Sequence, residues 1–193
     1  MAANGGVVAV AERVEIYGPE CTGKTTLARE LGVRLGGVVS GEYVRRWVEE
    51  KGRSPIVGDL REIGAGQRAV EEDAVRRAGA AATAGAGGLV FHDTDQHTHC
   101  IYSRHYLGVC LPETEAAAGA ADYAHHLLCE TDLPWEPDGL QRDSPEARAA
   151  LFPKFVEELE RSGRPFTRIG GTGEARCEAA VRAVRRVLEG RRR

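Results

Sequence analysis

The stretch Gly18-Pro19-Glu20-Cys21-Thr22-Gly23-Lys24-Thr25 reads G-x-x-x-x-G-K-T. A short apolar run at 14–17 leads into it, and a helical pattern follows from residue 26. Strand, glycine-rich loop and helix in this order is the setting in which a P-loop binds phosphate, whereas a chance match in a glycine-rich chain would not need these flanks. The glycines let successive backbone N–H groups turn inward, and the start of the helix adds partial positive charge. The stretch therefore predicts a site for a nucleoside triphosphate.

Within this loop each polar side chain has an expected role. Lys24 should reach the β- and γ-phosphates as a catalytic residue, and the Thr25 hydroxyl should ligate Mg²⁺. The expected cofactors are ATP and Mg²⁺, although the motif is equally compatible with GTP. Cys21 lies beside Lys24 and the helix start, which would make its thiol prone to oxidation or alkylation, and no catalytic role is assigned to it. The residues expected to contact the nucleotide are Gly18, Glu20, Cys21, Thr22, Gly23, Lys24, Thr25 and Thr26.

Length and charge narrow the class of protein. The chain has 193 residues, with 26 basic and 29 acidic side chains, which suits one domain with one core. The near balance of charge argues against a nucleic-acid or acidic-membrane surface. No apolar run approaches the length of a membrane span, and the five cysteines are scattered without paired spacing, as expected of reduced thiols. We therefore expect a soluble, cytoplasmic protein with no membrane or nucleic-acid partner, and we predict no oligomeric state.

Short apolar segments alternate with helical patterns along the chain. A loose lead-in at 1–12 precedes a single domain at 13–190, in which a Pro- and Gly-rich loop at about 134–147 has the composition of a lid. Alternating strands and helices predict an α/β fold of the P-loop kinase type, with a five-stranded parallel sheet covered on both faces. The strands are expected at 13–17, 38–40, 89–92, 125–129 and 166–169. The longest helical pattern runs from 59 to about 82, and residues 111–121 are expected to form a linker or a short helix.

Acidic residues follow two of these strands, at the edge where ligands bind in parallel sheets. Asp93 ends an apolar strand, the usual place of the carboxylate that holds Mg²⁺ through water, although it or Asp95 could instead cap the next helix. Glu42 follows the second strand, where a small-molecule kinase needs a base that faces the acceptor hydroxyl. Either Glu42 or Asp93 could be the residue nearest that hydroxyl.

Two side chains in the expected lid have open alternatives. Trp135 follows a strand end, where its ring could stack on a nucleobase or pyridine ring, or could instead fasten the loop to the core. Arg142 could close over the transferring phosphate as a catalytic guanidinium, or could be a solvated surface arginine.

A group of histidines and one cysteine invites a zinc interpretation. The spacing argues against it, because residues two apart on a helix point in different directions and no second Cys/His pair supplies ligands. We therefore interpret them as polar helix residues near a site. The group comprises His92, His97, His99, Cys100 and His105.

Taken together, these residues resemble the nicotinamide riboside kinase domain of the bacterial NadR-type NAD-salvage proteins. The resemblance covers about residues 13–176, with the blocks in family order. The blocks are GPECTGKTTLA (18–28), GEYVRRW (41–47), LREIGAGQ (60–67), LVFHDTD (89–95), LLCETDLPWEPDGLQRD (127–143) and FTRIGG with the following Arg176.

The resemblance implies transfer of the ATP γ-phosphate to the 5′-hydroxyl of nicotinamide riboside, a small-molecule substrate, to give the mononucleotide. It implies that Trp135 lies against the pyridine ring and that Arg142 is the lid arginine, although the family commonly reads D-G-L-R where this chain has Gln141 before Arg142. Multidomain members add a DNA-binding head and an adenylyltransferase domain, and we expect a standalone kinase without either. The residues that it places at the riboside are Glu42, Tyr43, Arg45, Asp93 and Trp135, and it places Asp138 near the riboside or the lid.

Two other functions are compatible with the sequence. One is a P-loop kinase for another small nucleoside or sugar-like alcohol. The other is a regulatory module that senses NAD metabolites and hydrolyses ATP slowly. A kinase is favoured because Glu42, Arg45 and Trp135 supply an acceptor side beyond the phosphate loop.

Overall fold

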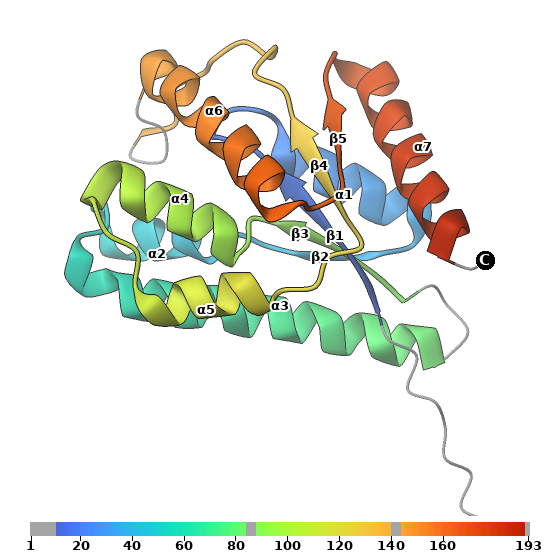
Figure 1. Ribbon diagram of the computed structural model, residues 1–193, viewed down its shortest axis with the longest axis horizontal. Coiled ribbons are helices and arrows are strands. Elements are labelled where there is room, and N and C mark those ends of the chain that lie inside the picture. Colours follow the sequence, from blue (N-terminus) through green and yellow to red (C-terminus); the bar gives the residue numbers. More distant parts are fainter. Residues whose placement is uncertain (1–10, 84–87, 140–143, 192–193) are drawn as a thin grey trace, which may run out of the picture.

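The computed structural model describes residues 11–83, 88–139 and 144–191. A single parallel sheet runs through it in the order β2-β3-β1-β4-β5 (Figure 1). This confirms the predicted α/β fold with a five-stranded parallel sheet. The strands are β1 (Glu12–Tyr17), β2 (Val38–Ser40), β3 (Leu89–Asp93), β4 (His125–Cys129) and β5 (Phe166–Ile169).

Helices cover both faces of the sheet, as the alternating pattern predicts. One face packs on α1 and α7, through a core that includes Ile16, Leu31 and Val184. The opposite face packs on α3, α4 and α6, where Phe155 lies beside Tyr17. The described helices are α1 (Lys24–Leu35), α2 (Tyr43–Lys51), the 3₁₀ turn η1 (Val57–Asp59), α3 (Leu60–Thr83), α4 (Gln96–Leu107), α5 (Pro112–Ala120), α6 (Pro145–Ser162) and α7 (Gly173–Arg191). No helix of the described ranges is both long and apolar enough to span a bilayer.

Local signals place most helix ends. Gly36 adopts the left-handed conformation that ends α1, and the Ser144 hydroxyl accepts a hydrogen bond from the Ala147 amide at the start of α6. The long helix starts later than predicted, because Asp59 accepts a hydrogen bond from the Ile56 amide in a 3₁₀ turn before α3 begins at Leu60. Residues 111–121, expected to be a linker or short helix, form α5.

The face of the sheet under α3 and α4 buries an unusual number of polar groups. Glu15 on β1 is fully buried, and neither of its carboxylate oxygens has a hydrogen-bond partner within the described ranges. Glu71 of α3 and Asp95 lie close enough to raise its pKa further, although burial is the largest cause. Arg13 contributes the positive charge, 3.7 Å from the Glu71 carboxylate. Alternation along β1 predicts that Glu15 faces away from Val14 and Ile16, but not that the face it enters is closed to water.

Glu71 should make the stability of the fold depend on pH. Burial, reinforced by Asp95 and opposed by Arg13, raises the pKa of Glu71 to about 8. Between about 4.5, the ordinary value, and 8, the folded state therefore keeps a proton that the unfolded state releases. The free energy of unfolding should then fall as pH rises through this window, and Glu71→Gln should remove at least ~1 kcal/mol of that fall.

Urea unfolding of the original protein and Glu71→Gln at pH 6 and pH 8.5 measures this difference. The exposed neighbour Glu72, changed to Gln, is the matched control and should leave the pH dependence unchanged. Parallel pH curves for the original protein and Glu71→Gln would contradict the assignment.

Candidate active site

The G-x-x-x-x-G-K-T loop joins β1 to α1, and both of its glycines, Gly18 and Gly23, have positive φ angles. Gly18 has φ 137° and Gly23 has φ 74°, and Cys21 between them also has a positive φ of 55°. The Lys24 ammonium and the Thr22 hydroxyl each donate to the Pro19 carbonyl at 2.8 Å. This carbonyl is therefore held by side chains of the loop itself.

Two arginines from the C-terminal half of the chain donate hydrogen bonds to the backbone carbonyls of Cys21 and Thr22. Arg148 of α6 donates to the Cys21 carbonyl at 3.1 Å. Arg176 of α7 is buried and donates to the Thr22 carbonyl at 2.7 Å, while its other nitrogen lies 3.2 Å from the Asp132 carboxylate. Because the two arginines satisfy these carbonyl oxygens, the backbone N–H groups of the loop remain available to bind an anion. Arg148 carries no sequence motif that predicts this contact.

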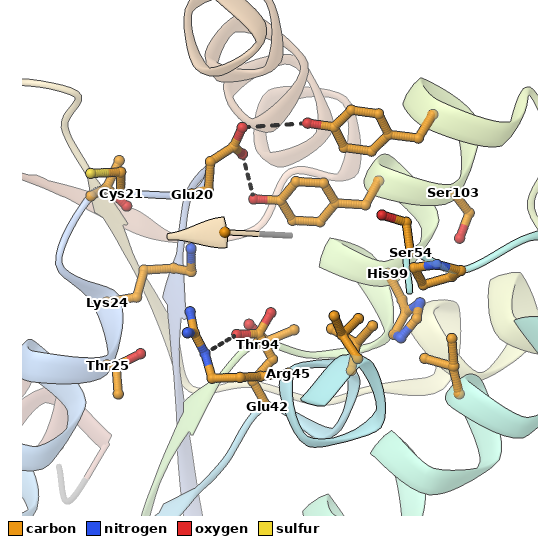
Figure 2. Close-up of a pocket in the computed structure, with 18 of the residues that line it drawn as sticks. Glu20, Cys21, Lys24, Thr25, Glu42, Arg45, Ser54, Thr94, His99 and Ser103 are labelled. Atoms are coloured by element: carbon orange, nitrogen blue, oxygen red, sulfur yellow. Dashed lines mark hydrogen bonds and ion pairs between the residues drawn. The ribbon is translucent and has the colours of Figure 1, made fainter. Parts of the chain in front are cut away.

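A cavity of about 730 Å³ extends from the loop to the space between α2, α3 and α4 (Figure 2). The residues that line it include seven of the eight expected to contact the nucleotide, all but Gly18. Beyond the loop it is lined by Glu42, Val44, Arg45, Val48, Ser54, Pro55, Leu60, Ile63, Thr94, His99, Tyr102, Ser103, Tyr106, Leu107 and Gly139. The volume suits a small-molecule site.

The Asp93 carboxylate ends β3 beside the loop. Asp93 is the register partner of Ile16 on β1, so it lies at the same edge of the sheet from which the loop departs. It is buried, and its Oδ1 atom has no hydrogen-bond partner among the described residues. Thr25, in the first turn of α1, lines the cavity. Asp93 itself is not among the lining residues. A buried, unsatisfied carboxylate oxygen at the sheet edge from which the phosphate loop departs fits a role in holding a hydrated Mg²⁺ ion.

Asp95 has a structural contact of its own. Its Oδ1 atom accepts a hydrogen bond from the Thr98 amide and caps α4. Thr94 between the two aspartates has φ 80°, which is strained for a β-branched residue. The Gln67 amide supports this turn by donating to the Thr94 carbonyl at 2.9 Å, and it accepts from the Tyr43 amide at 2.8 Å. One buried glutamine therefore joins the turns that follow β2 and β3.

Glu42, Arg45 and Asp138 form a chain of charges at the cavity. The Arg45 guanidinium lies 3.5 Å from the Glu42 carboxylate and 2.9 Å from the Asp138 carboxylate. Burial raises the pKa of Glu42, and Lys24 and Arg45 oppose that shift. Asp138 belongs to the expected lid, so this ion pair joins the lid loop to α2. Figure 2 shows Glu42 and Arg45 near Thr94.

Glu20 has partners that the loop motif does not predict. Its carboxylate accepts hydrogen bonds from the hydroxyls of Tyr102, at 3.0 Å, and Tyr106, at 3.4 Å (Figure 2). Both tyrosines lie on α4, with ring planes 3° from parallel. Although Glu20 belongs to the phosphate loop, its side chain turns toward the α4 wall. Spacing of 102 and 106 by one helical turn was the only sequence signal for this contact.

Other expected site residues lie elsewhere. The Tyr43 ring packs against α3 where a Cβ on Gly66 would overlap it, and Arg46 stacks over the same ring. Trp135 is half-buried in its loop and is not among the residues that line the cavity. Its loop contacts the phosphate loop, because the Glu136 amide donates to the Cys21 sulfur at 3.2 Å. Arg142 lies outside the described residues.

The histidine group separates into different environments. His92 is a buried residue of β3, next to β1 in the sheet, and accepts a hydrogen bond from Arg13. His105 lies 2.9 Å from the Lys154 ammonium. Only His99 lines the cavity. In the part of the chain that the structure describes, no three His, Cys, Asp or Glu side chains are arranged to hold a metal ion.

Comparison with known proteins agrees with this fold. The sequence profile of a family described as "AAA domain" matches residues 13–176. A comparison with curated protein sequences found no match. Two solved NadR structures, one in complex with NR and one in complex with NAD and AMP-PNP, each align with a TM-score of 0.73 over 92% of this chain at 20% identity. This chain spans 52% and 50% of those NadR chains, about half their length.

A thymidylate kinase from Ehrlichia chaffeensis aligns with a TM-score of 0.64 at 13% identity, over 92% of this chain and 98% of its own. At these identities the likeness concerns the fold, which is shared with P-loop kinases. The profile match, by contrast, covers most of the sequence and includes the phosphate loop, Glu42, Asp93 and Arg176. The chain therefore belongs to the AAA domain family.

Proposed function

We propose that the protein is a kinase that transfers the γ-phosphoryl group of ATP to the 5′-hydroxyl of nicotinamide riboside, giving nicotinamide mononucleotide. The observation that carries this proposal is a single cavity that joins the phosphate loop to an acceptor compartment between α2, α3 and α4. A module that only binds or slowly hydrolyses ATP needs no such compartment.

The walls of the compartment suit a pyridine nucleoside. The hydrogen-bond partners of the Glu20 carboxylate within the described ranges are two neutral tyrosine hydroxyls, so its negative charge is available to a cationic ligand. The ring of nicotinamide riboside is a pyridinium cation, which the negative charge of this carboxylate attracts into the cavity. NadR, whose fold this chain shares, has been solved in complex with NR.

In the proposed reaction Lys24 holds the β- and γ-phosphates, and the loop amides bind their oxygens. Thr25, and Asp93 through water, would hold Mg²⁺, which would neutralise part of the phosphate charge. Glu42 accepts the proton of the 5′-hydroxyl, helped by the raised pKa of its buried carboxyl. Arg45 fixes the orientation of Glu42 and connects it to Asp138. Such transfer depends mainly on positioning and on stabilisation of charge.

An ADP-release assay with ATP, Mg²⁺ and a panel of nucleosides tests the proposal. Strong stimulation by nicotinamide riboside, with the mononucleotide identified as product, is the expected result. Stimulation by a different nucleoside would support a kinase for that acceptor, and slow ATP loss unaffected by every acceptor would support a regulatory module.

Lys24→Ala should abolish phosphoryl transfer and leave the fold intact. The ammonium lines the cavity and donates a hydrogen bond to the Pro19 carbonyl, so its loss removes phosphate binding and not core packing. Turnover should fall by at least ~10³-fold, while circular dichroism and the unfolding midpoint stay near those of the original protein. The exposed Lys51, changed to Ala, is the control. Near-normal transfer in Lys24→Ala would refute the assignment of the phosphate loop.

Glu42→Gln should change the pH profile as well as the rate. A base whose pKa is raised loses its charge as pH falls through a value above the ordinary 4.5, so kcat/KM of the original protein should decline there. The amide cannot titrate, and we expect a rate lower by about 10- to 100-fold with that acid limb removed.

The matched control for Glu42→Gln is Glu49→Gln, an exposed carboxylate on the same helix. This control should keep both rate and profile. If Glu42→Gln retained the acid limb and the rate, Asp93 would be the better candidate for the base.

Arg176→Met should weaken ATP binding although the side chain does not line the cavity. Methionine fills the buried volume but leaves the Thr22 carbonyl without its donor. We expect the Kd for ATP with Mg²⁺, measured by calorimetry, to rise by about 10-fold or more. Arg182→Met, an exposed arginine on the same helix, should leave it unchanged. Equal affinities for all three proteins would show that the loop holds its shape without Arg176.

A further inference from the structure

The cavity is divided by charge. Its formally charged lining side chains within the described ranges are Glu20 and Lys24 of the phosphate loop and Glu42 and Arg45 at the start of α2. Figure 2 shows Lys24, Thr25 and Cys21 on one side of the cavity and Ser54, His99 and Ser103 on the other. The side remote from Lys24 and Thr25, called here the far end, carries Ser54, His99 and Ser103 (Figure 2). The apolar residues that α2, α3 and α4 add to the cavity lining are Val44, Val48, Leu60, Ile63 and Leu107.

Helix α4 supplies the polar groups of this far end from one face. His99 and Ser103 are spaced by four residues, and Tyr102 and Tyr106 follow at three and seven from His99, so that all four share one side of the helix. The tyrosines hold Glu20, whereas His99 and Ser103 lie deeper and are buried. Asp95 caps the helix and fixes where this face begins.

His99 has unused hydrogen-bonding capacity. The residue is 7% exposed, and its Nε2 atom has no hydrogen-bond partner within the described part of the chain. Burial lowers the pKa of His99 to about 4, with Asp95 opposing the shift, so the imidazole is neutral at physiological pH. A neutral imidazole offers one donor and one acceptor, and the Ser103 hydroxyl offers both.

We infer that the far end binds the ring of the acceptor nucleoside and that His99 and Ser103 select an uncharged carboxamide on that ring over a carboxylate. This inference rests on the proposed function and names the part of the site that sets its specificity. Val48, Ile63 and Leu60 offer apolar walls to the ring faces. A carboxamide, which has one acceptor oxygen and two donor hydrogens, matches the capacity of a neutral imidazole and a hydroxyl.

A carboxylate would be bound poorly at the same place. It would lose its hydration in a compartment where the described lining residues include no cation beyond Lys24 and Arg45. Lys24 is committed to phosphate, and Arg45 already faces the carboxylates of Glu42 and Asp138. An anion buried without a positive partner is costly, so the amide should be favoured strongly.

The test compares kcat/KM for nicotinamide riboside and for its carboxylic acid analogue. We expect the original protein to favour the amide by at least ~10-fold. His99→Leu should lower kcat/KM for the amide by about 10-fold. Ser103→Ala removes a single hydroxyl, which the fold should tolerate, and should also lower kcat/KM for the amide. Both variants should leave the KM for ATP unchanged. His99→Lys, which places an ammonium of similar reach at the far end, should shift the ratio toward the acid.

His105→Leu is the matched control, because this histidine lies on the same helix but does not line the cavity. It should keep the ratio of the original protein. Unfolding midpoints identify any variant that fails to fold, and Ser103→Ala alone then decides.

Two results would overturn the inference in distinguishable ways. In the first, the original protein phosphorylates nicotinamide riboside but the folded variants all keep its amide-to-acid ratio. The far end then does not bind the ring substituent, and the proposed function stands. If the original protein phosphorylates neither riboside, the proposed function fails and the inference fails with it.

Discussion

The hydrogen bond from Arg176 to the Thr22 carbonyl is the contact on which the phosphate loop depends. A loop can turn several N–H groups toward an anion only if the carbonyls between them find donors on the outside. Here those donors come from α6 and α7, the last helices of the chain, through Arg148 and Arg176. The motif at the N-terminus is therefore completed by the C-terminal half. Arg176 is itself buried, and the Asp132 carboxylate, in the loop that follows β4, supplies its counter-charge.

The parallel sheet converts sequence distance into proximity at one edge. Glu42 follows β2 and Asp93 ends β3, and these strands are neighbours in the sheet. Gln67 then makes the two turns one unit, since its single amide group bonds to the Thr94 carbonyl and the Tyr43 amide. The positive φ of Thr94, a strain of order 1–3 kcal/mol, persists because both sides of this turn are held. The cost is incurred at a residue that lines the cavity.

The sequence predicts those features that are local or periodic. The glycine spacing identifies the phosphate loop, apolar runs identify the strands, and the sheet rule brings Glu42 and Asp93 to one edge. It does not predict contacts that depend on how helices dock. Glu20 reads as a loop residue but bonds to tyrosines of α4, and His99 reads as one of several helix histidines until the docking of α4 places it on the cavity. The prediction of a long helix from 59 differs by the 3₁₀ turn, because a side-chain cap at Asp59 is a local alternative that periodicity does not register.

Helix α4 connects the phosphate loop with the far end of the cavity. One face of it holds the Glu20 carboxylate of the phosphate loop through two tyrosines and, one turn earlier, carries His99. A helix is stiff over this length, so a shift of α4 that loosens the far end also moves the groups that orient Glu20. If the far end binds the ring as proposed, recognition of the ring and arrangement of the phosphate loop are coupled through one rigid element. Two buried acids act on this helix in opposite ways. The Asp95 carboxylate anchors its start by accepting a hydrogen bond from the Thr98 amide, whereas burial raises the pKa of Glu15, so entry of water beside Glu15 would be favoured as pH rises.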